Sequence, residues 1–581
     1  MLDTIVRPQR LLAAKAWHDK THRFNNIYYF ICRRDWIEEA LKQVLDNKGS
    51  GTAGIDGQTV ANLRKQEERT QLINEIHRDL KSKQYHPTPV RRAYIPKRDR
   101  RKRPLGIPTI KDRVAQCLLK MLLEPIYESD FFDCSSGFRT MRRTMDCIAS
   151  CYTNINSLHK YYWVIEGDIE GCFDHIHHKR LLQILRKRIS DKHVINLISK
   201  FLNAGIMEGT LFKYSPEGVP QGGIFSPLLA NVYLNELDRW WYQNYFQTAS
   251  RRYRRRKMGL GNYILVRYAD DFVMLCNGSK QSTEDMKLQL QSFLKQELRL
   301  KLSMEKTKVT HVQDGFDFLG FSIKHQRRKS ENGRLVLLVK PSHRNIGRLK
   351  DKIRLMTAHQ ATLDNDYNKI LAINSILRGW SEYYKHVSSS RVFRTLDYWV
   401  ERRLVGWLSD KHKLGVRQAV HRFQKSQCEQ GRKRRNIGIR YAEDKILWLY
   451  KMSDQHITKY RRRRFGNPFF SATNRDGEGV PPIADTDMPL PEQRWNGNTK
   501  AYQWRDVRDA ILERDAYLCA NPSCRSAVNL DIHHVSPRTR RPDLTLDASN
   551  LITLCENCHY AMHAGKLRLK TLSPDDGEPN A

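Results

Sequence analysis

The spacing of apolar residues changes along the chain, and each change predicts a different kind of structure. Short apolar runs at 163–168, 264–268 and 272–276 predict β-strands. The last two runs are separated by an alanine and two aspartates, which predicts a β-hairpin with a carboxylate pair at its tip. From about 345 to 460 the spacing becomes helical, with aromatic residues three and four positions apart.

Turn-forming residues divide the rest of the chain. The first 90 or so residues are predicted to be polar and helical, interrupted by the turn-rich stretch 51–57. Residues 466–500 are rich in proline, glycine and asparagine, which is typical of a linker. A small unit that carries cysteine and histidine follows, from about 505 to 570.

The charge of the chain is strongly positive, which indicates the kind of partner it meets. Its 581 residues include 101 Lys and Arg against 63 Asp and Glu, a net charge of +38. A polyanion relieves self-repulsion of this size. Basic clusters at 251–257, 432–435 and 461–464 favour a track for a phosphate backbone, although each alone is typical of a solvated surface. Nucleic acid is therefore the predicted partner.

Neither a membrane span nor a secretory signal is predicted. No stretch approaches about 20 apolar residues, the length that crosses a bilayer. Residues 1–23 contain two aspartates and no long apolar run, which is not the pattern of a secretory signal. Most of the 12 cysteines are scattered, which favours a reducing compartment over a disulfide framework.

Three aspartates lie at the ends of predicted strands and are the first candidates for catalysis. Asp168 ends one strand, and Asp270 and Asp271 lie between two others. Joining a nucleotide to a strand requires charge neutralisation at phosphorus, which two Mg²⁺ ions about 3.5–4 Å apart supply through carboxylate ligands. A lone Asp-Asp pair is also typical of a solvent-exposed turn, so the assignment depends on the flanking residues.

The flanking residues resemble the palm of reverse transcriptases. Tyr268–Asp271 lies between apolar strands, downstream of Asp168–Asp174. Further matches follow in the order that the family has, and the first resembles a block found in group II intron proteins. These matches are 54–57, 92–97, 103–108, 136–139, 218–227, 302–308 and 318–320.

The resemblance implies an RNA-templated DNA polymerase with a metal site. Asp168, Asp270 and Asp271 would hold two Mg²⁺ ions, with the Ile169 carbonyl close by. The implied substrates are an RNA template, a DNA primer and dNTPs.

The resemblance also implies which residues contact the incoming nucleotide. Lys97 and Arg103 would hold the triphosphate, a task that suits an ammonium and a guanidinium group. Phe173 would lie under the sugar and exclude a 2′-hydroxyl, which selects dNTPs. Gln221 would touch the nucleotide. Lys306 is a further candidate, with an uninvolved surface lysine as the alternative.

Residues 345–460 resemble the thumb, or maturase domain, of group II intron proteins, most clearly at 377–386. Trp380, Tyr383 and Tyr384 share a helix face, where core packing is favoured over base stacking. The surrounding Lys and Arg would grip RNA phosphates. The implied partner is a group II intron RNA, and the implied role is assistance in its splicing.

Two close pairs of cysteines mark the C-terminal unit. Cys519 with Cys524, and Cys555 with Cys558, match a tetrahedral structural Zn²⁺ site. A unit this small needs a bound metal ion to stay folded. Scattered buried cysteines are the alternative interpretation.

The residues around these cysteines resemble the HNH nuclease motif. The resemblance implies His534 as the general base that activates water, and His533, His559 and His563 as ligands of one divalent ion, Mg²⁺ in use. Asn550 would order the loop that orients His534. A four-cysteine zinc module without catalysis is the alternative.

These resemblances together predict a group II intron-encoded protein with an α+β multidomain fold. It would combine right-hand polymerase fingers and palm, a helical thumb (maturase domain X) and a small zinc-stapled ββα-metal HNH domain. The expected boundaries are 1–90 for an N-terminal extension and the start of the fingers, 91–335 for fingers and palm, 336–465 for the thumb, 466–504 for a DNA-binding or linker region, 505–570 for the endonuclease and 571–581 for a tail.

The expected function is intron mobility by target-primed reverse transcription, with maturase activity and cleavage of a target DNA. A retron or defence-type reverse transcriptase is one alternative, which the C-terminal unit disfavours. A non-catalytic RNA-binding splicing factor is another, which the intact aspartates disfavour. The expected location is the cytoplasm or nucleoid of a bacterium, or else a mitochondrion or chloroplast.

Overall fold

The computed structural model describes most of the N-terminal part of the chain and a smaller share of the C-terminal part. The described residues are 3–96, 102–156, 160–208, 211–214, 217–219, 222–246, 248–327, 335–358, 364–429, 432–442, 445–460, 467–469, 507, 510–512, 514–516, 518–524, 526, 530–536, 544 and 546–563. The chain forms two compact units, Met1–Val480 and Pro481–Ala581.

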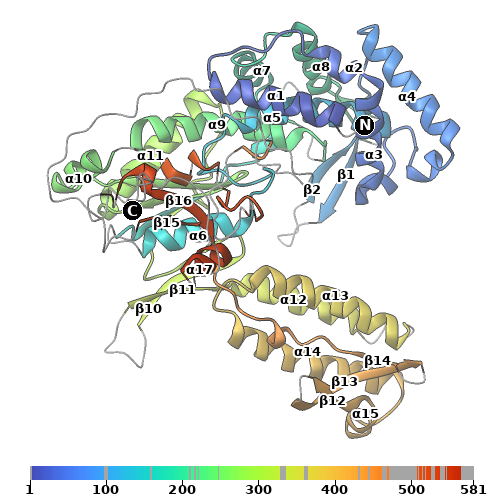
Figure 1. The fold of residues 1–581 in the computed structure, drawn as a ribbon. Helices are drawn as coiled ribbons and strands as arrows, with labels where there is room; N and C mark the ends of the chain where they lie inside the picture. The colour runs from blue at the N-terminus through green and yellow to red at the C-terminus, as the bar shows by residue number, and fades with distance from the viewer. Residues whose placement is uncertain are drawn as a thin grey trace, which may run out of the picture. The chain divides into compact units, whose positions relative to one another are not determined.

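The N-terminal helices of the first unit pack around α5, most of whose residues are buried (Figure 1). They are α1 (Asp3–His18), α2 (Tyr28–Cys32), α3 (Arg34–Asp46), α4 (Gln66–Lys81) and α5 (Ile110–Glu128). Short 3-10 helices, η1 (Lys48–Gly51) and η2 (Val60–Leu63), flank the turn-rich stretch that the sequence predicted. No helix in the described part of the chain combines the length and apolar character needed to cross a bilayer.

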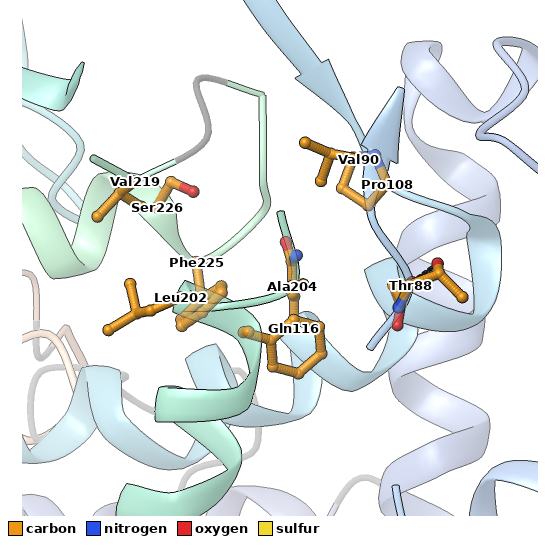
Figure 2. Close-up of a pocket in the computed structure, with 11 residues that line it drawn as sticks. Thr88, Val90, Pro108, Gln116, Leu202, Ala204, Val219, Phe225 and Ser226 are labelled. Atoms are coloured by element: carbon orange, nitrogen blue, oxygen red, sulfur yellow. Dashed lines mark hydrogen bonds between the residues drawn. The ribbon is translucent and has the colours of Figure 1, made fainter. Parts of the chain in front are cut away.

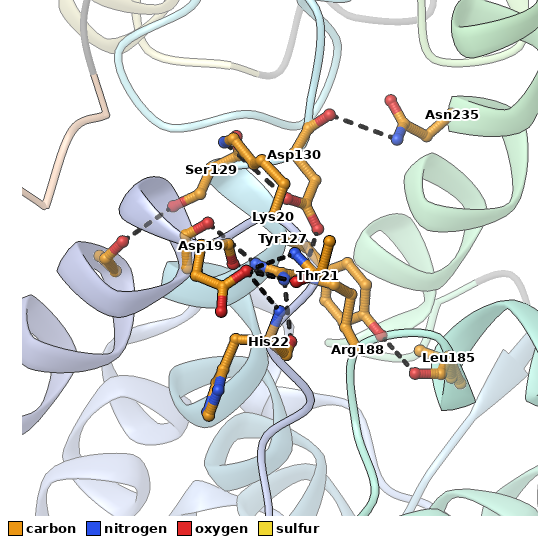
Figure 3. Close-up of polar contacts among 12 residues, drawn as sticks. Asp19, Lys20, Thr21, His22, Tyr127, Ser129, Asp130, Leu185, Arg188 and Asn235 are labelled. Carbon is orange, nitrogen blue, oxygen red and sulfur yellow. Dashed lines mark hydrogen bonds and ion pairs between the residues drawn. The ribbon is translucent and has the colours of Figure 1, made fainter. Parts of the chain in front are cut away.

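A buried arginine ties the end of α1 to the body of this unit (Figure 3). The Arg188 guanidinium donates hydrogen bonds to the carbonyls of Ala16, Asp19 and His22, each at 2.9 Å, and pairs with the Asp130 carboxylate at 2.8 Å. Ala16 lies in the last turn of α1, where carbonyls have no intrahelical partner, so its bond to Arg188 satisfies a group that burial would otherwise leave unpaired.

The first sheet has the strand order β2-β1-β4-β5. Its strands are β1 (Val90–Pro96), β2 (Lys102–Ile107), β4 (Ile206–Glu208) and β5 (Leu211–Lys213). β1 pairs with β2 in antiparallel and with β4 in parallel orientation. The helices α7 (His178–Arg186) and α8 (Lys192–Leu202) precede β4 in the chain.

The second sheet carries the predicted catalytic hairpin. Its order is β6-β7-β3-β8, with antiparallel pairs throughout, and its strands are β3 (Trp163–Gly167), β6 (Tyr263–Tyr268), β7 (Asp271–Cys276) and β8 (Lys308–His311). The strands predicted at 163–168, 264–268 and 272–276 are therefore confirmed. The neighbouring helices are α6 (Thr144–Ile155), α9 (Ser226–Tyr245), α10 (Ala249–Lys257) and α11 (Lys280–Glu297).

A third sheet, of order β11-β10-β9, leads into the helical region after the palm. Its elements are β9 (Phe316–Phe318), β10 (Phe321–Arg327), β11 (Leu335–Pro341), α12 (His343–Met356), α13 (Asp366–Tyr384), α14 (Ser390–Lys411) and α15 (Val416–Phe423). Tyr384 is buried, its hydroxyl donates to the Gly320 carbonyl at 3.0 Å, and its ring centroid lies 4.5 Å from that of Trp380. Core packing of Trp380 and Tyr384 is thus confirmed. Tyr383 stacks on Phe321 with 5.2 Å between ring centroids, but it is 37% exposed and so lies at the edge of the core.

The prediction of helical structure throughout 345–460 is wrong near its C-terminal end. There, β12 (Gln424–Glu429), β13 (Arg432–Ala442) and β14 (Lys445–Trp448) form an antiparallel sheet. Ile437 and Ile439 of β13 are buried, and β-branched residues favour strands. The many basic residues around them hide this short β pattern in the sequence.

The described part of the second unit contains an antiparallel strand pair followed by a helix. These elements are β15 (Leu530–His534), β16 (Leu551–Cys555) and α17 (Glu556–His563). Its buried side chains form two small groups. One contains Cys519, Ile552, Leu554, Cys555 and Cys558, and the other Ile511, Leu512, Ile532 and Leu551.

Candidate active sites

Sheet register brings Asp168 beside the aspartates of the hairpin. β3 runs antiparallel to β7, and the last pair in their ladder is Gly167 with Phe272. Asp168 directly follows Gly167, and Asp271 directly precedes Phe272, so the two aspartates lie side by side at the end of this ladder. Paired residues in an antiparallel ladder have Cα atoms about 4.5–5.5 Å apart.

The turn of the β6–β7 hairpin has a backbone conformation that is uncommon outside glycine. Tyr268 pairs with Asp271, which leaves Ala269 and Asp270 as the turn, and Ala269 has a φ of 58°. Two-residue hairpin turns use positive φ because it matches the twist of the flanking strands. Burial, and then the charge of Asp270, raise the pKa of the thiol of Cys172 in η3 (Cys172–His175). Asp270 therefore lies near the segment that follows Asp168.

A glycine from a distant loop packs directly against this turn. A Cβ atom at Gly137 would lie 2.2 Å from the backbone nitrogen of Ala269, a distance that no side chain can occupy. The Asn231 side chain donates to the Gly137 carbonyl at 2.7 Å and so holds the glycine in place.

A fully buried ion pair supports the same turn, and the sequence reasoning missed it. Arg267 and Asp238 both have side-chain exposures of 0%, and Nε of Arg267 donates to the Asp238 carboxylate at 2.8 Å. The guanidinium also donates to Asn231 Oδ1 at 3.1 Å and to the Ala269 carbonyl at 2.9 Å. Burial alone would lower the pKa of Arg267, but the Asp238 carboxylate raises it. The available signal was an arginine inside an apolar strand, because a buried charge requires a partner.

The segment predicted as a late palm motif brackets Asp168. The Ser303 amide donates to the Asp168 carbonyl at 2.8 Å, and the Asp168 amide donates to Thr307 Oγ1 at 3.4 Å. Nζ of Lys306 lies 2.9 Å from the Asp168 carboxylate. Ile169 is buried and forms an isolated β-bridge to the same segment. Lys306 thus lies at the site, as the partner of a carboxylate.

Phe173 lies where two of the predicted motifs meet. It belongs to η3, and its carbonyl accepts a hydrogen bond from the Val219 amide at 2.7 Å. The Gly218 amide donates to the Ile176 carbonyl at 2.9 Å. The start of the 218–227 motif is therefore packed onto the segment that carries Phe173.

A small cavity lies on the other side of the same motif (Figure 2). Its volume is about 10 Å³, and its lining includes Val219, Phe225 and Ser226 from the motif and Gln116 from α5. Gln116 Oε1 accepts a hydrogen bond from the Ile224 amide at 2.8 Å. A space of this size holds about one water molecule. The cavity is therefore a small gap where the 218–227 motif packs against α5, and it is too small to hold a nucleotide.

Three of the predicted nucleotide contacts fall on residues whose side chains the structure does not describe. Lys97 and Gln221 lie outside the described residues. Arg103 is part of β2, opposite Ile95 in the ladder, and its side chain lies outside the described set. Their roles stay predictions.

Four cysteine sulfurs converge in the second unit. Among the described residues, Cys519, Cys524, Cys555 and Cys558 form the one group of three or more His, Cys, Asp or Glu side chains whose ligand atoms all lie within 4.8 Å of one another. Sγ of Cys524 lies 3.6 Å from Sγ of Cys555. Sulfurs around a tetrahedral zinc, with bonds near 2.3 Å, are about 3.8 Å apart. The sulfur arrangement fits a structural Zn²⁺.

The palm aspartates lie close together at the end of the sheet, but their carboxylate oxygens are farther apart than the four cysteine sulfurs are. Like charges repel, so neighbouring carboxylates converge fully only when cations lie between them. The Lys306 ammonium at Asp168 is one such cation. An all-carboxylate donor set suits Mg²⁺, which prefers oxygen ligands.

Two of the predicted nuclease histidines face each other between β15 and α17. The ring centroids of His533 and His559 are 5.0 Å apart, with an angle of 80° between the planes. Nδ1 of His559 lies 3.9 Å from the Asp531 carboxylate. His534 is the last residue of β15, and His563 is the last of α17, with a side chain outside the described set.

Asn550 closes the loop between β15 and β16. Its Oδ1 accepts a hydrogen bond from the Ser536 amide at 2.7 Å, and its Nδ2 donates to the carbonyls of Ser536 at 3.1 Å and Leu544 at 3.2 Å. The Asn550 carbonyl accepts from the Val535 amide at 2.9 Å. These bonds fix the chain directly after His534.

The aspartates at the end of an antiparallel sheet fit the site expected for a nucleic-acid polymerase, and comparison with known families identifies the class of protein. Residues 95–323 match the reverse transcriptase (RNA-dependent DNA polymerase) family. Residues 346–425 match the group II intron maturase-specific domain, and residues 518–565 match the HNH endonuclease family.

Several known proteins resemble this chain over much of their own length. The chain is 37% identical over 351 residues to protein YkfC of Escherichia coli, covering 57% of this chain and 91% of the relative. It is 32% identical over 480 residues to the group II intron-encoded protein LtrA of Lactococcus lactis subsp. cremoris, covering 69% of this chain and 77% of the relative. It is 28% identical over 611 aligned positions to an uncharacterized 91 kDa protein in the cob intron of Schizosaccharomyces pombe, covering 94% of this chain and 70% of that protein.

The chain belongs to the family of group II intron-encoded proteins. It joins a reverse transcriptase, a maturase domain and an HNH endonuclease domain, as the sequence predicted. The expectation of a multidomain α+β fold of the reverse transcriptase type is confirmed at that level.

Proposed function

We propose that Asp168, Asp270 and Asp271 form the polymerase centre by holding two Mg²⁺ ions. The register that sets Asp168 beside Asp271, at the turn that carries Asp270, is the observation that supports this most strongly. When bound, the ions would neutralise charge at the reacting phosphate and activate the primer 3′-hydroxyl. The Ile169 carbonyl would lie beside them.

The nucleotide would be held by residues on the fingers and around η3. Lys97 and Arg103 would bind the triphosphate, because one is a compact ammonium and the other a planar guanidinium suited to phosphate oxygens. Gln221 would contact the nucleotide, and Phe173 would exclude a 2′-hydroxyl. The Lys306 ammonium pairs with the Asp168 carboxylate at the centre. From this position Lys306 would lie within reach of the triphosphate.

The C-terminal unit would cut DNA with one divalent ion. His534 would take the proton from the attacking water, while His533, His559 and His563 would bind the ion. The 5.0 Å separation of the His533 and His559 rings supports a shared ion between them. Asn550 would orient His534 through the loop bonds described above, and Zn²⁺ on the four cysteines would hold the unit folded.

The full chain would act as a ribonucleoprotein with its own group II intron RNA. The thumb would help that RNA to splice, the nuclease would cut the target DNA, and the polymerase would copy the RNA from the cut 3′ end. The thumb would extend over 336–465, and the nuclease over 505–570. The compartment would be bacterial cytoplasm and nucleoid, or an organelle.

The polymerase assignment is tested by the double variant Asp270→Ala plus Asp271→Ala in the full chain. We expect dNTP incorporation on a primed RNA to be abolished, because two of three metal ligands are lost. DNA nicking by the same preparation should persist, since the nuclease uses its own ion. Incorporation at the wild-type rate would show that the metal centre lies elsewhere.

A matched control separates lost chemistry from lost folding. Asp285→Ala removes a carboxylate from the described helix α11, and its side chain accepts a hydrogen bond from Gln281 on the same helix. This variant should incorporate dNTPs at the wild-type rate. A similar loss of activity in both variants would contradict the assignment.

A further inference from the structure

Phe138 has a backbone conformation that aromatic residues rarely adopt. Its φ is 59°, in the left-handed region, and its side chain is 53% exposed. A bulky residue with positive φ is a strained outlier, and such strain collects at functional sites. Core packing cannot explain this residue, because more than half of the ring is open to solvent.

The residues on both sides of Phe138 are clamped. Gly137 lies against the Ala269 backbone, at the turn that carries the catalytic aspartates. Arg139 is buried, and its guanidinium pairs with Glu128 at 2.6 Å. Arg139 also donates to the carbonyls of Phe132 and Ser135, each at 2.7 Å. These contacts hold the backbone on both sides of Phe138, and so support its strained conformation.

The Phe138 ring meets the ring of Phe173 edge to face. The two centroids are 6.3 Å apart, and the planes are at 85°. This lies within the range of favourable aromatic pairs. The backbone of Phe173 is held by the Val219 amide, and its partly buried ring has the Phe138 ring as an aromatic neighbour.

We propose that Phe138 is a positioning residue for sugar selection, which acts by holding the Phe173 ring at the angle that excludes a 2′-hydroxyl. The proposal rests on the proposed role of Phe173. One short loop would then contact both parts of the site. Gly137 packs against the turn that carries Asp270, and Phe138 contacts Phe173. The strain at Phe138 is maintained because its neighbours are fixed by buried contacts.

The test compares kcat/KM for dATP and for ATP in the full chain, on an RNA template with a DNA primer. Phe138→Gly removes the ring but accepts a positive φ without strain. We expect the dATP-to-ATP preference to fall about 2- to 10-fold, the size of an edge-to-face aromatic contact, while the melting temperature does not fall. Phe138→Tyr keeps the ring and should keep the preference.

Met141 supplies a matched control in the same loop. It also has a positive φ, 64°, and an exposed side chain. Because methionine has no aromatic ring, it cannot make an edge-to-face contact with Phe173. Met141→Gly should leave the dATP-to-ATP preference unchanged. An equal loss in Met141→Gly and Phe138→Gly would overturn the proposal, because it would indicate a general effect of loop mobility.

A double variant distinguishes failure of this proposal from failure of the role proposed for Phe173. Phe173→Val should lower the preference strongly, and adding Phe138→Gly to it should have no further effect. If Phe173→Val has no effect, Phe173 is not the sugar contact. If Phe173→Val lowers the preference but Phe138→Gly does not, or if the two effects simply multiply, Phe138 does not act through Phe173.

Discussion

The palm hairpin and the C-terminal nuclease unit hold their candidate catalytic residues in different ways. In the palm, sheet register sets the aspartates, while Gly137 and the buried pair Arg267–Asp238 fix the turn. In the nuclease unit, the described core consists of two small groups, and the larger of them contains three of the four cysteines.

This difference indicates what each site depends on. The palm hairpin takes its geometry from a large protein core, so its shape should survive without metal. The described nuclease strands pack against two small groups of buried side chains. We therefore expect this unit to obtain much of its folding free energy from metal binding. Variants of single residues in each unit test that contrast.

His534→Ala should lower DNA nicking by roughly 100- to 10,000-fold, the usual contribution of a general base. Primer extension should be unchanged, because the polymerase lies in the other unit. Nicking of a labelled DNA duplex and dNTP incorporation would be measured on the same preparation. Unchanged nicking would assign the base to another residue.

Arg267→Lys should lower the kcat of dNTP incorporation roughly 10- to 100-fold, because a catalytic group displaced by about 1 Å costs that much. Lysine keeps the positive charge beside Asp238. It lacks the planar guanidinium group, which in Arg267 also donates a hydrogen bond to the Ala269 carbonyl. The KM for dNTP should change little, since the residue touches no substrate. Steady-state kinetics would separate kcat from KM.

Arg188→Lys is the control for this effect. Arg188 pairs with Asp130, their side chains are 6% and 9% exposed, and the guanidinium binds three carbonyls near the end of α1 instead of the catalytic turn (Figure 3). We expect Arg188→Lys to lower the melting temperature about as much as Arg267→Lys does, but to leave kcat unchanged. Equal loss of kcat in the two variants would mean that Arg267 acts only through stability.

Asn550→Ala should lower nicking by about tenfold, the lower end of the range for residues that orient a metal site. The variant loses the bonds to Ser536 and Leu544, so the loop after His534 is no longer fixed. A larger loss, equal to that of His534→Ala, would indicate that Asn550 takes part in the chemistry.

The sequence predicted those features of the two sites that depend on the local pattern of residues. Alternating apolar runs separated by a short polar turn gave the β6–β7 hairpin, and the cysteine spacing indicated the sulfur cluster. Both signals lie within short windows, where spacing and side-chain chemistry are sufficient.

The long-range supports could not be predicted in the same way. The end of α9, all of α10 and most of β6 separate Asp238 from Arg267, and only the fold brings them together. Gly137 is required by a backbone contact with Ala269, which no local pattern shows. The sheet at 424–448 was missed because its few β-branched residues lie among many charged ones.

Hydrogen exchange by mass spectrometry on the full chain, with and without a zinc-selective chelator in excess Mg²⁺, tests the contrast between the two sites most directly. Amides of 530–534 and 551–555 should exchange much faster after zinc removal, while amides of 263–268 and 271–276 keep their protection and primer extension continues. Unchanged protection of the nuclease strands, or loss of protection in the palm hairpin, would contradict the account.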